Sequence, residues 1–186
     1  MTPSLGAFIV ILVFVALERL AEVAVSLRRL RGRPAARVTE PALLPFMVLL
    51  HVALVVAPVV EVVVQDRPFS PLLASLAAVA LVLATALRVW AMRALGRAWN
   101  VAVIVPSVVV STGPFAWVRH PNYLVVVLEV ACLPLLHGAW LSCITLSVWN
   151  ALVLARRIRT EEAALETVPA WRAAMRGKAR LVPGVL

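Results

Sequence analysis

Two short polar segments of this chain contain residue types that can bind anions and transfer protons. The first, at residues 113–123, has the sequence GPFAWVRHPNY and leads directly into an apolar stretch. The second, at residues 157–165, has the sequence RIRTEEAAL and leaves the next apolar stretch. The polar groups therefore lie at the two ends of one predicted membrane hairpin. Such an arrangement could hold a polar cofactor beside a lipid-like substrate.

The start of the hairpin has the features of an anion site. His120 and Pro121 open the apolar stretch, and proline is favoured in the first turn of a helix because its missing N–H has no partner to lose. The free N–H groups and the positive end of the helix dipole attract an anion. Arg119 and His120 add donors, so the sequence predicts a carboxylate or phosphate site. The alternative is a basic helix start at the interface, with Trp117 and Tyr123 as aromatic anchors.

Three further ionisable residues are candidates for the chemistry. Arg157 and Glu161 are four residues apart and share one helix face, where the simpler interpretation is an ion pair at the membrane exit. Glu129 lies inside an apolar stretch, and a carboxylate there is costly and marks a candidate site. The weaker candidates, each more typical of a helix interface or of the headgroup region, are Glu18, Glu22, His51 and Glu61.

The composition is that of an integral membrane protein. Of the 186 residues, 63% are hydrophobic and 15% are charged, and the mean hydropathy is +0.98. A soluble domain of this size could not bury so much apolar surface. The net charge of +9 does not indicate nucleic-acid binding, because the arginines lie in short loops beside apolar stretches. Cys132 and Cys143 indicate neither a disulfide framework nor a metal site, and no metal is predicted.

The apolar stretches predict an all-α fold with five transmembrane helices. Their ranges are 5–27, 43–64, 72–92, 123–136 and 139–155, and about 20 residues are needed to cross a bilayer. Arginine-rich and arginine-poor loops alternate, which predicts an external N-terminus and a cytoplasmic C-terminus, in what we expect to be a bacterial cell membrane. The last helix should continue to about Glu166, and an amphipathic piece at 170–175 should lie on the membrane surface.

We expect one membrane domain over residues 1–186. Residues 1–92 would form the three N-terminal spans, and residues 166–186 would form a cytoplasmic tail. Between them, residues 93–165 would contain the cofactor loop, the helical hairpin and the catalytic motif.

The two polar segments resemble the isoprenylcysteine carboxyl methyltransferase family. The match rests on residues 113–123 and on Arg157-x-x-x-Glu161-Glu162-x-x-Leu165. Members are integral membrane enzymes that use S-adenosylmethionine without a Rossmann domain. The first segment alone also resembles phospholipid methyltransferases and sterol reductases. The N-terminal half, with ERLAE at 18–22 and MVLLH at 47–51, is more similar to a bacterial branch that includes O-methyltransferases for alkylpyrones and alkylresorcinols.

The resemblance implies an S-adenosylmethionine-dependent O-methyltransferase. Its acceptor would be a carboxylate or acidic hydroxyl on a lipid-like molecule, prenylcysteine-like or alkylpyrone-like. Arg157 would face this acceptor, and Phe115 replaces a frequent family tyrosine. We add Glu129 as a candidate base for phenolic acceptors, because burial can raise a carboxyl pKa. The residues implied in cofactor binding are Ser107, Val108, Val109, Val110, Phe115, His120, Pro121, Asn122, Tyr123 and Glu161. The alternatives are a phospholipid N-methyltransferase and a non-catalytic membrane protein or transporter.

Overall fold

The computed structural model describes residues 2–31, 43–101 and 109–183. Regular structure in these ranges is helical, apart from an isolated bridge between Val118 and Ala179. The helices are α1 (Pro3–Arg31), α2 (Leu44–Val64), α3 (Pro71–Leu95), the short 3-10 helices η2 (Gly96–Ala98) and η3 (Gly113–Ala116), then α4 (Pro121–Leu135), α5 (Trp140–Leu165) and α6 (Pro169–Met175).

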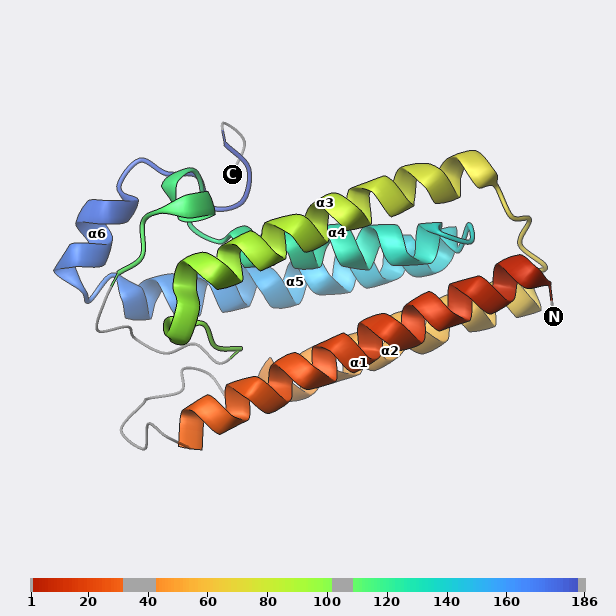
Figure 1. Ribbon diagram of the computed structural model, residues 1–186, viewed down its shortest axis with the longest axis horizontal. Helices are drawn as coiled ribbons and strands as arrows, with labels where there is room; N and C mark the ends of the chain where they lie inside the picture. The colour runs from red at the N-terminus through yellow and green to blue at the C-terminus, as the bar shows by residue number, and fades with distance from the viewer. Residues whose placement is uncertain (1, 32–42, 102–108, 184–186) are drawn as a thin grey trace.

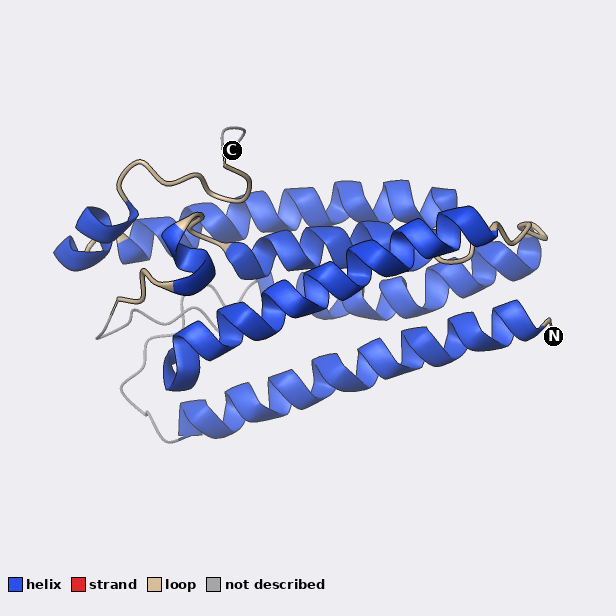
Figure 2. Ribbon diagram, turned by 45° about the horizontal axis from the view of Figure 1, so that its top comes forward, coloured by secondary structure: helices blue, strands red, loops and turns tan. Residues whose placement is uncertain are grey.

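The helices α1 to α5 run along the long axis of the molecule (Figure 1). One pair, α1 and α2, lies beside a second group in which α4 packs against both α3 and α5. The N-terminus, the α2–α3 link and the α4–α5 turn share one end (Figure 2). The segments η3, α6 and the C-terminal tail gather at the other end, where both polar motifs lie. The core between the two groups is apolar and includes Leu12, Leu50, Leu54, Val130 and Leu133.

Three helices in the described ranges are long and apolar enough to cross a membrane. They are α2, α3 extended through Ala98, and α5. Apolar side chains such as Leu72 and Val82 stand on the exposed faces of these helices, as expected where lipid is the solvent. The chain is therefore an integral membrane protein. α4 is apolar but has 15 residues, and α1 includes Glu18, Arg19 and Glu22, so the count of five spans stays a prediction.

Helix boundaries follow from local residue chemistry. Ser70 caps α3, since its Oγ accepts a hydrogen bond from the Leu73 N–H at 3.4 Å, and Pro71 occupies the first turn. Gly113 begins η3 with a φ of +60°, and a Cβ there would lie 3.1 Å from Trp90 Nε1. Glycine is therefore needed at this position both for its backbone conformation and for the close approach of η3 to α3.

The end of α5 agrees with the sequence prediction. The helix continues beyond its apolar part through Arg157 and Glu161 and stops at Leu165, with Glu166 as its C-cap. Val168 separates it from α6. The extension carries the second polar motif away from the apolar bundle and places it beside the start of α4.

Glu61 proves to be a helix cap at the opposite end of the bundle. Its carboxylate accepts hydrogen bonds from the backbone N–H groups of Leu141 at 3.0 Å and Ser142 at 2.6 Å. Arg67 Nη2 lies 3.1 Å from the same carboxylate. An anion at the positive end of α5 is favoured by the helix dipole. Glu61 therefore has a structural role at a helix interface, where it stabilises the start of α5.

Candidate active site

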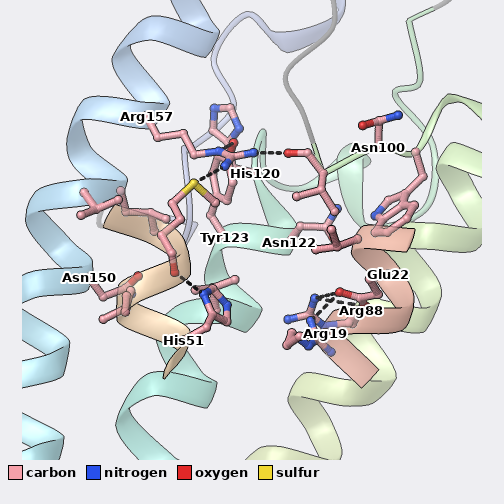
Figure 3. A pocket seen from close by; sticks show the side chains of 18 of the residues that line it. Arg19, Glu22, His51, Arg88, Asn100, His120, Asn122, Tyr123, Asn150 and Arg157 are labelled. Atoms are coloured by element: carbon pink, nitrogen blue, oxygen red, sulfur yellow. Dashed lines mark hydrogen bonds and ion pairs between the residues drawn. The ribbon is translucent and has the colours of Figure 1, made fainter. Parts of the chain in front are cut away.

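A cavity of about 610 Å³ lies between the five long helices. Its volume is within the usual range for small-molecule sites, roughly 300–1,000 Å³. One part of its wall is polar and includes His120, Tyr123 and Arg157, as Figure 3 shows. Another part is apolar and includes Leu12 and Leu54. One cavity thus joins both sequence motifs to a lining suited to an apolar chain.

The polar wall is organised around the Tyr123 hydroxyl. This hydroxyl donates a short hydrogen bond to Glu161 Oε2 and accepts one from Arg157 Nε at 2.8 Å. The His120 ring stacks on the Tyr123 ring with centroids 5.2 Å apart, and the Arg157 guanidinium lies 5.4 Å from the same ring's centroid. Arg157 and Glu161 therefore meet at the hydroxyl of Tyr123, and both the His120 ring and the Arg157 guanidinium contact the tyrosine ring.

The remaining donors of Arg157 reach two other parts of the chain. Nη1 lies 2.6 Å from the Met47 sulfur of α2, and Nη2 donates to the Val101 carbonyl. A thioether is a weak acceptor, so an anionic oxygen would bind this guanidinium more strongly than Met47 does. Arg157 thus retains the capacity to hold an acidic ligand.

The predicted anion site at the start of α4 is filled by a carboxylate of the chain itself. Glu162 is 4% exposed, and its Oε1 lies 3.2 Å from Arg119 Nη1 and 3.3 Å from His120 Nε2. The backbone N–H groups of Tyr123 and Leu124 are bonded to the His120 carbonyl. The expectation that Arg119 and His120 are free for a ligand anion is therefore wrong, because both donors are already occupied by Glu162.

The C-terminal tail fixes this arrangement by crossing over the first motif. The N–H groups of Arg119 and His120 donate to the carbonyls of Ala179 and Arg180, each at 2.9 Å. Arg180 also binds Glu162, with Nη2 2.8 Å from Oε2. The hydrogen bond to Glu162 and its negative charge raise the pKa of Arg180 above its ordinary value. We call residues 178–180 the C-terminal strap; they position the motif from outside the cavity.

Most of the sequence-predicted cofactor residues line the cavity. Ser107 and Val108 lie outside the described residues. The others are Val109, Val110, Phe115, His120, Pro121, Asn122, Tyr123 and Glu161, and each contributes to the cavity wall together with Arg157. Phe115 is also packed among Ala91, Leu165, Trp171 and Met175.

Asn122 contributes a buried side-chain oxygen to the cavity wall. Within the described ranges its Oδ1 has no hydrogen-bond donor, and the residue lines the cavity. Buried side-chain oxygens usually accept at least one hydrogen bond. The site therefore offers an acceptor to a ligand that carries an N–H or O–H group.

Glu129 is committed to an ion-pair network that the sequence did not reveal. Its Oε2 lies 2.6 Å from Arg88 Nη2, and its Oε1 lies 3.7 Å from Arg19 Nη2. Arg88 and Arg19 also bind Glu22, at 3.2 and 2.8 Å. The cavity wall includes Arg19, Glu22 and Arg88 but not Glu129. The carboxylate faces cations rather than the cavity, so the geometry favours a structural role over proton abstraction from an acceptor.

Sequence reasoning missed several residues of the site. Glu162 is adjacent to the predicted Glu161, and no local signal shows which of the two faces His120. Arg180 and Lys178 lie in a tail with no motif. Asn150 lines the cavity and is 3% exposed; a single amide in an apolar stretch was a signal that could have found it. His51, considered a weaker candidate, also lines the cavity.

Comparison with known proteins connects this site to one family. The sequence profile described as the Isoprenylcysteine carboxyl methyltransferase (ICMT) family matches residues 76–167. This range includes most of α3, the whole of α4 and α5, and both polar motifs. The chain is also 36% identical over 124 residues to a Bacillus subtilis (strain 168) protein with the name "Uncharacterized protein YpbQ". That alignment covers 66% of this chain and 73% of the Bacillus protein.

Proposed function

Because this chain belongs to the isoprenylcysteine carboxyl methyltransferase family, we propose that it is an S-adenosylmethionine-dependent O-methyltransferase of the membrane. Its acceptor would be a lipid-like molecule with a carboxylate or an acidic hydroxyl. The family and the apolar helices make it a membrane methyltransferase. We further propose S-adenosylmethionine as the cofactor, an acidic oxygen as the acceptor and a cytoplasmic location for the site.

The observation that carries the proposal is the single cavity with two kinds of lining. Its polar wall combines Tyr123, Glu161 and Arg157, while Leu12 and Leu54 contribute to its apolar wall. A polar cofactor and the head of an apolar acceptor could thus meet in one cavity. Proximity and alignment of the two reactants are major contributions that a protein makes to a methyl transfer.

The residues of the polar wall fit the chemistry of S-adenosylmethionine. The Glu161 carboxylate and the Tyr123 ring suit a cationic sulfonium, and the Asn122 oxygen, which lacks a donor among the described residues, suits an amino group. Val109, Val110 and Phe115 provide an apolar wall for the adenosyl group. When bound, the cofactor supplies a methyl group that its positive sulfur activates.

Arg157 would hold the acceptor oxygen as an anion. A guanidinium is permanently charged and can bind two oxygens at once. The Tyr123 hydroxyl fixes its Nε, which leaves the Nη1 contact with Met47 as the one that an acceptor could displace. A carboxylate or an acidic enol is already ionised near neutral pH, so Arg157 would need to orient it and not to deprotonate it.

A phospholipid N-methyltransferase is the second candidate. It must remove a proton from an ammonium group, and its site should present an uncommitted base. Glu161 is bonded to Tyr123, Glu162 to the first motif and Glu22 to two arginines. These carboxylates are therefore all committed, which favours an acceptor that arrives as an anion; His51 remains a candidate base in the cavity wall.

Methyl transfer from labelled S-adenosylmethionine to a panel of acceptors tests the proposal. The panel should contain prenylcysteines, alkylpyrones, alkylresorcinols and phospholipids, each supplied in detergent to the purified protein. We expect label in an acidic oxygen acceptor and none in a phospholipid amine. Label in the phospholipid alone would favour the second candidate, and label in none of them would refute the proposal.

A further inference from the structure

Two polar side chains of the cavity wall have no part in the proposed cofactor site or in the Arg157 contact. They are His51 on α2 and Asn150 on α5. Figure 3 labels both and shows them away from the cluster of Arg19, Glu22 and Arg88. Polar groups in an otherwise apolar part of a membrane protein are costly, and a ligand that uses them would offset that cost.

His51 presents a hydrogen-bond acceptor. Its Nδ1 lies 2.7 Å from the carbonyl oxygen of Met47. A carbonyl oxygen can only accept, so Nδ1 carries the proton and Nε2 of the neutral ring is left with a lone pair. Among the described residues, no donor binds this second nitrogen, which therefore suits a ligand hydroxyl or N–H group.

Asn150 presents an amide that can both donate and accept. The residue is 3% exposed, and within the described ranges its side chain has no hydrogen-bond partner. It lines the same cavity as His51, and α2 packs against α5. Since buried amides are nearly always hydrogen-bonded, a polar group inside the cavity is the natural partner of Asn150.

The helix register places both residues deeper than Arg157. Asn150 comes seven residues before Arg157 on α5, or about 10 Å along the axis. The Met47 sulfur contacts Arg157, and His51 follows Met47 by four residues on α2, or about 6 Å. Farther along α2, the cavity wall is apolar and includes Leu54. The two polar side chains thus lie between the guanidinium and the apolar lining.

We propose that His51 and Asn150 form a subsite for a second polar group of the acceptor, one that donates a hydrogen bond. The acceptor would then carry its reactive oxygen at Arg157, a hydroxyl or amide N–H beside His51 and Asn150, and an apolar chain beyond them. The subsite rests on the proposed function, because Arg157 marks the position of the reactive oxygen. It narrows the acceptor class, since a simple fatty acid has no such second group.

Matched ligand pairs test the subsite. One pair is an alkylresorcinol and the alkylphenol of equal chain length, which lacks one hydroxyl. The other is N-acetyl-S-farnesylcysteine and its analogue without the acetamido group. Dissociation constants are measured in detergent micelles for the wild type, His51→Phe and Asn150→Leu. Thr145→Val serves as the control, because Thr145 lies on α5 but bonds only to backbone carbonyls.

The wild-type protein should prefer the member with the second group by about tenfold in at least one pair, the value of one hydrogen bond. The pair that shows the preference identifies whether a hydroxyl or an amide is bound. His51→Phe and Asn150→Leu should reduce the preference to about twofold or less, while Thr145→Val should retain it. The affinity for the member that lacks the group should be nearly the same in all four proteins.

Two results would overturn the subsite. One is a wild-type protein with no preference in either pair, and the other is a preference that survives both cavity variants, as expected if only water meets these side chains. The proposed reaction can fail separately. Loss of the preference in both variants, without any transfer of label to these ligands, would support the subsite and refute the methyl transfer.

Discussion

Arg88→Met should destabilise the protein strongly, because one guanidinium joins two buried carboxylates. Arg88 Nη2 lies 2.6 Å from Glu129 Oε2, and Nη1 lies 3.2 Å from Glu22 Oε2. The Arg88 side chain is 8% exposed. Methionine would retain most of the apolar stem and remove the charge. Among the described residues, Glu129 would then keep the longer ion pair with Arg19, at 3.7 Å.

The magnitude follows from leaving a charge buried without its partner. Removing one member of a buried ion pair typically costs about 3–5 kcal/mol. Replacing both members with apolar residues costs less, because no uncompensated charge remains. Arg88→Met/Glu129→Leu should therefore be more stable than Arg88→Met alone. The two substitutions should be coupled by about 1–3 kcal/mol.

Unfolding in mixed micelles, followed by tryptophan fluorescence, gives the free energies for the wild type, both single variants and the double variant. Arg88→Met within about 0.5 kcal/mol of the wild type would refute the reasoning, as would strictly additive losses. Glu129→Gln separates structure from catalysis. We expect the folded fraction of Glu129→Gln to transfer methyl groups at close to the wild-type rate. A stably folded Glu129→Gln protein without turnover would instead indicate that Glu129 acts as a catalytic base.

Three other predictions concern the site and the topology. Arg157→Ala should lower kcat/KM for an acidic acceptor about 10- to 100-fold, since a charged hydrogen bond is lost, and unchanged turnover in the labelled-methyl assay would exclude the anion-holding role. Arg180→Ala should weaken cofactor binding about two- to fivefold, a small effect because this strap side chain is 53% exposed; a titration that shows the wild-type affinity would mean that the strap does not position the site. Cysteines introduced at Ser70 and Arg176, in a background without Cys132 and Cys143, should react with impermeant reagents from opposite sides of the membrane, and labelling of both from the same side would contradict the predicted count of five spans.

Much of the fold could be predicted because apolar stretch length and helix-ending residues are local signals. The ranges 43–64 and 72–92 anticipated α2 and α3 closely. The extension of α5 to Leu165 followed from the continued helical pattern before Pro169. The count of membrane crossings was harder to predict. The charged side chains within α1 depend on neighbouring helices for their solvation, and α4 is short for a full crossing.

The site was predictable where its residues are close in sequence and not where packing brings them together. Tyr123 and Asn122 follow His120 directly, so one motif places all three. The partner of His120 is 42 residues away, and the partner of Glu129 is 41 residues away. No periodicity specifies such pairs. The sequence consequently predicted a free anion site at a position that the Glu162 carboxylate occupies in the fold. It also presented Glu129 without a partner, whereas the fold pairs it with Arg88.

Equilibrium binding of S-adenosylmethionine to the purified protein tests the central claim most directly. The claim predicts saturable binding by the wild type and a loss of about 10- to 100-fold in affinity for Glu161→Gln, the effect of losing a charged partner in the cavity. Glu166→Gln, an exposed carboxylate on the following turn, should bind like the wild type. Absence of binding by the wild type, or equal affinity in Glu161→Gln, would contradict the placement of the cofactor at this cavity.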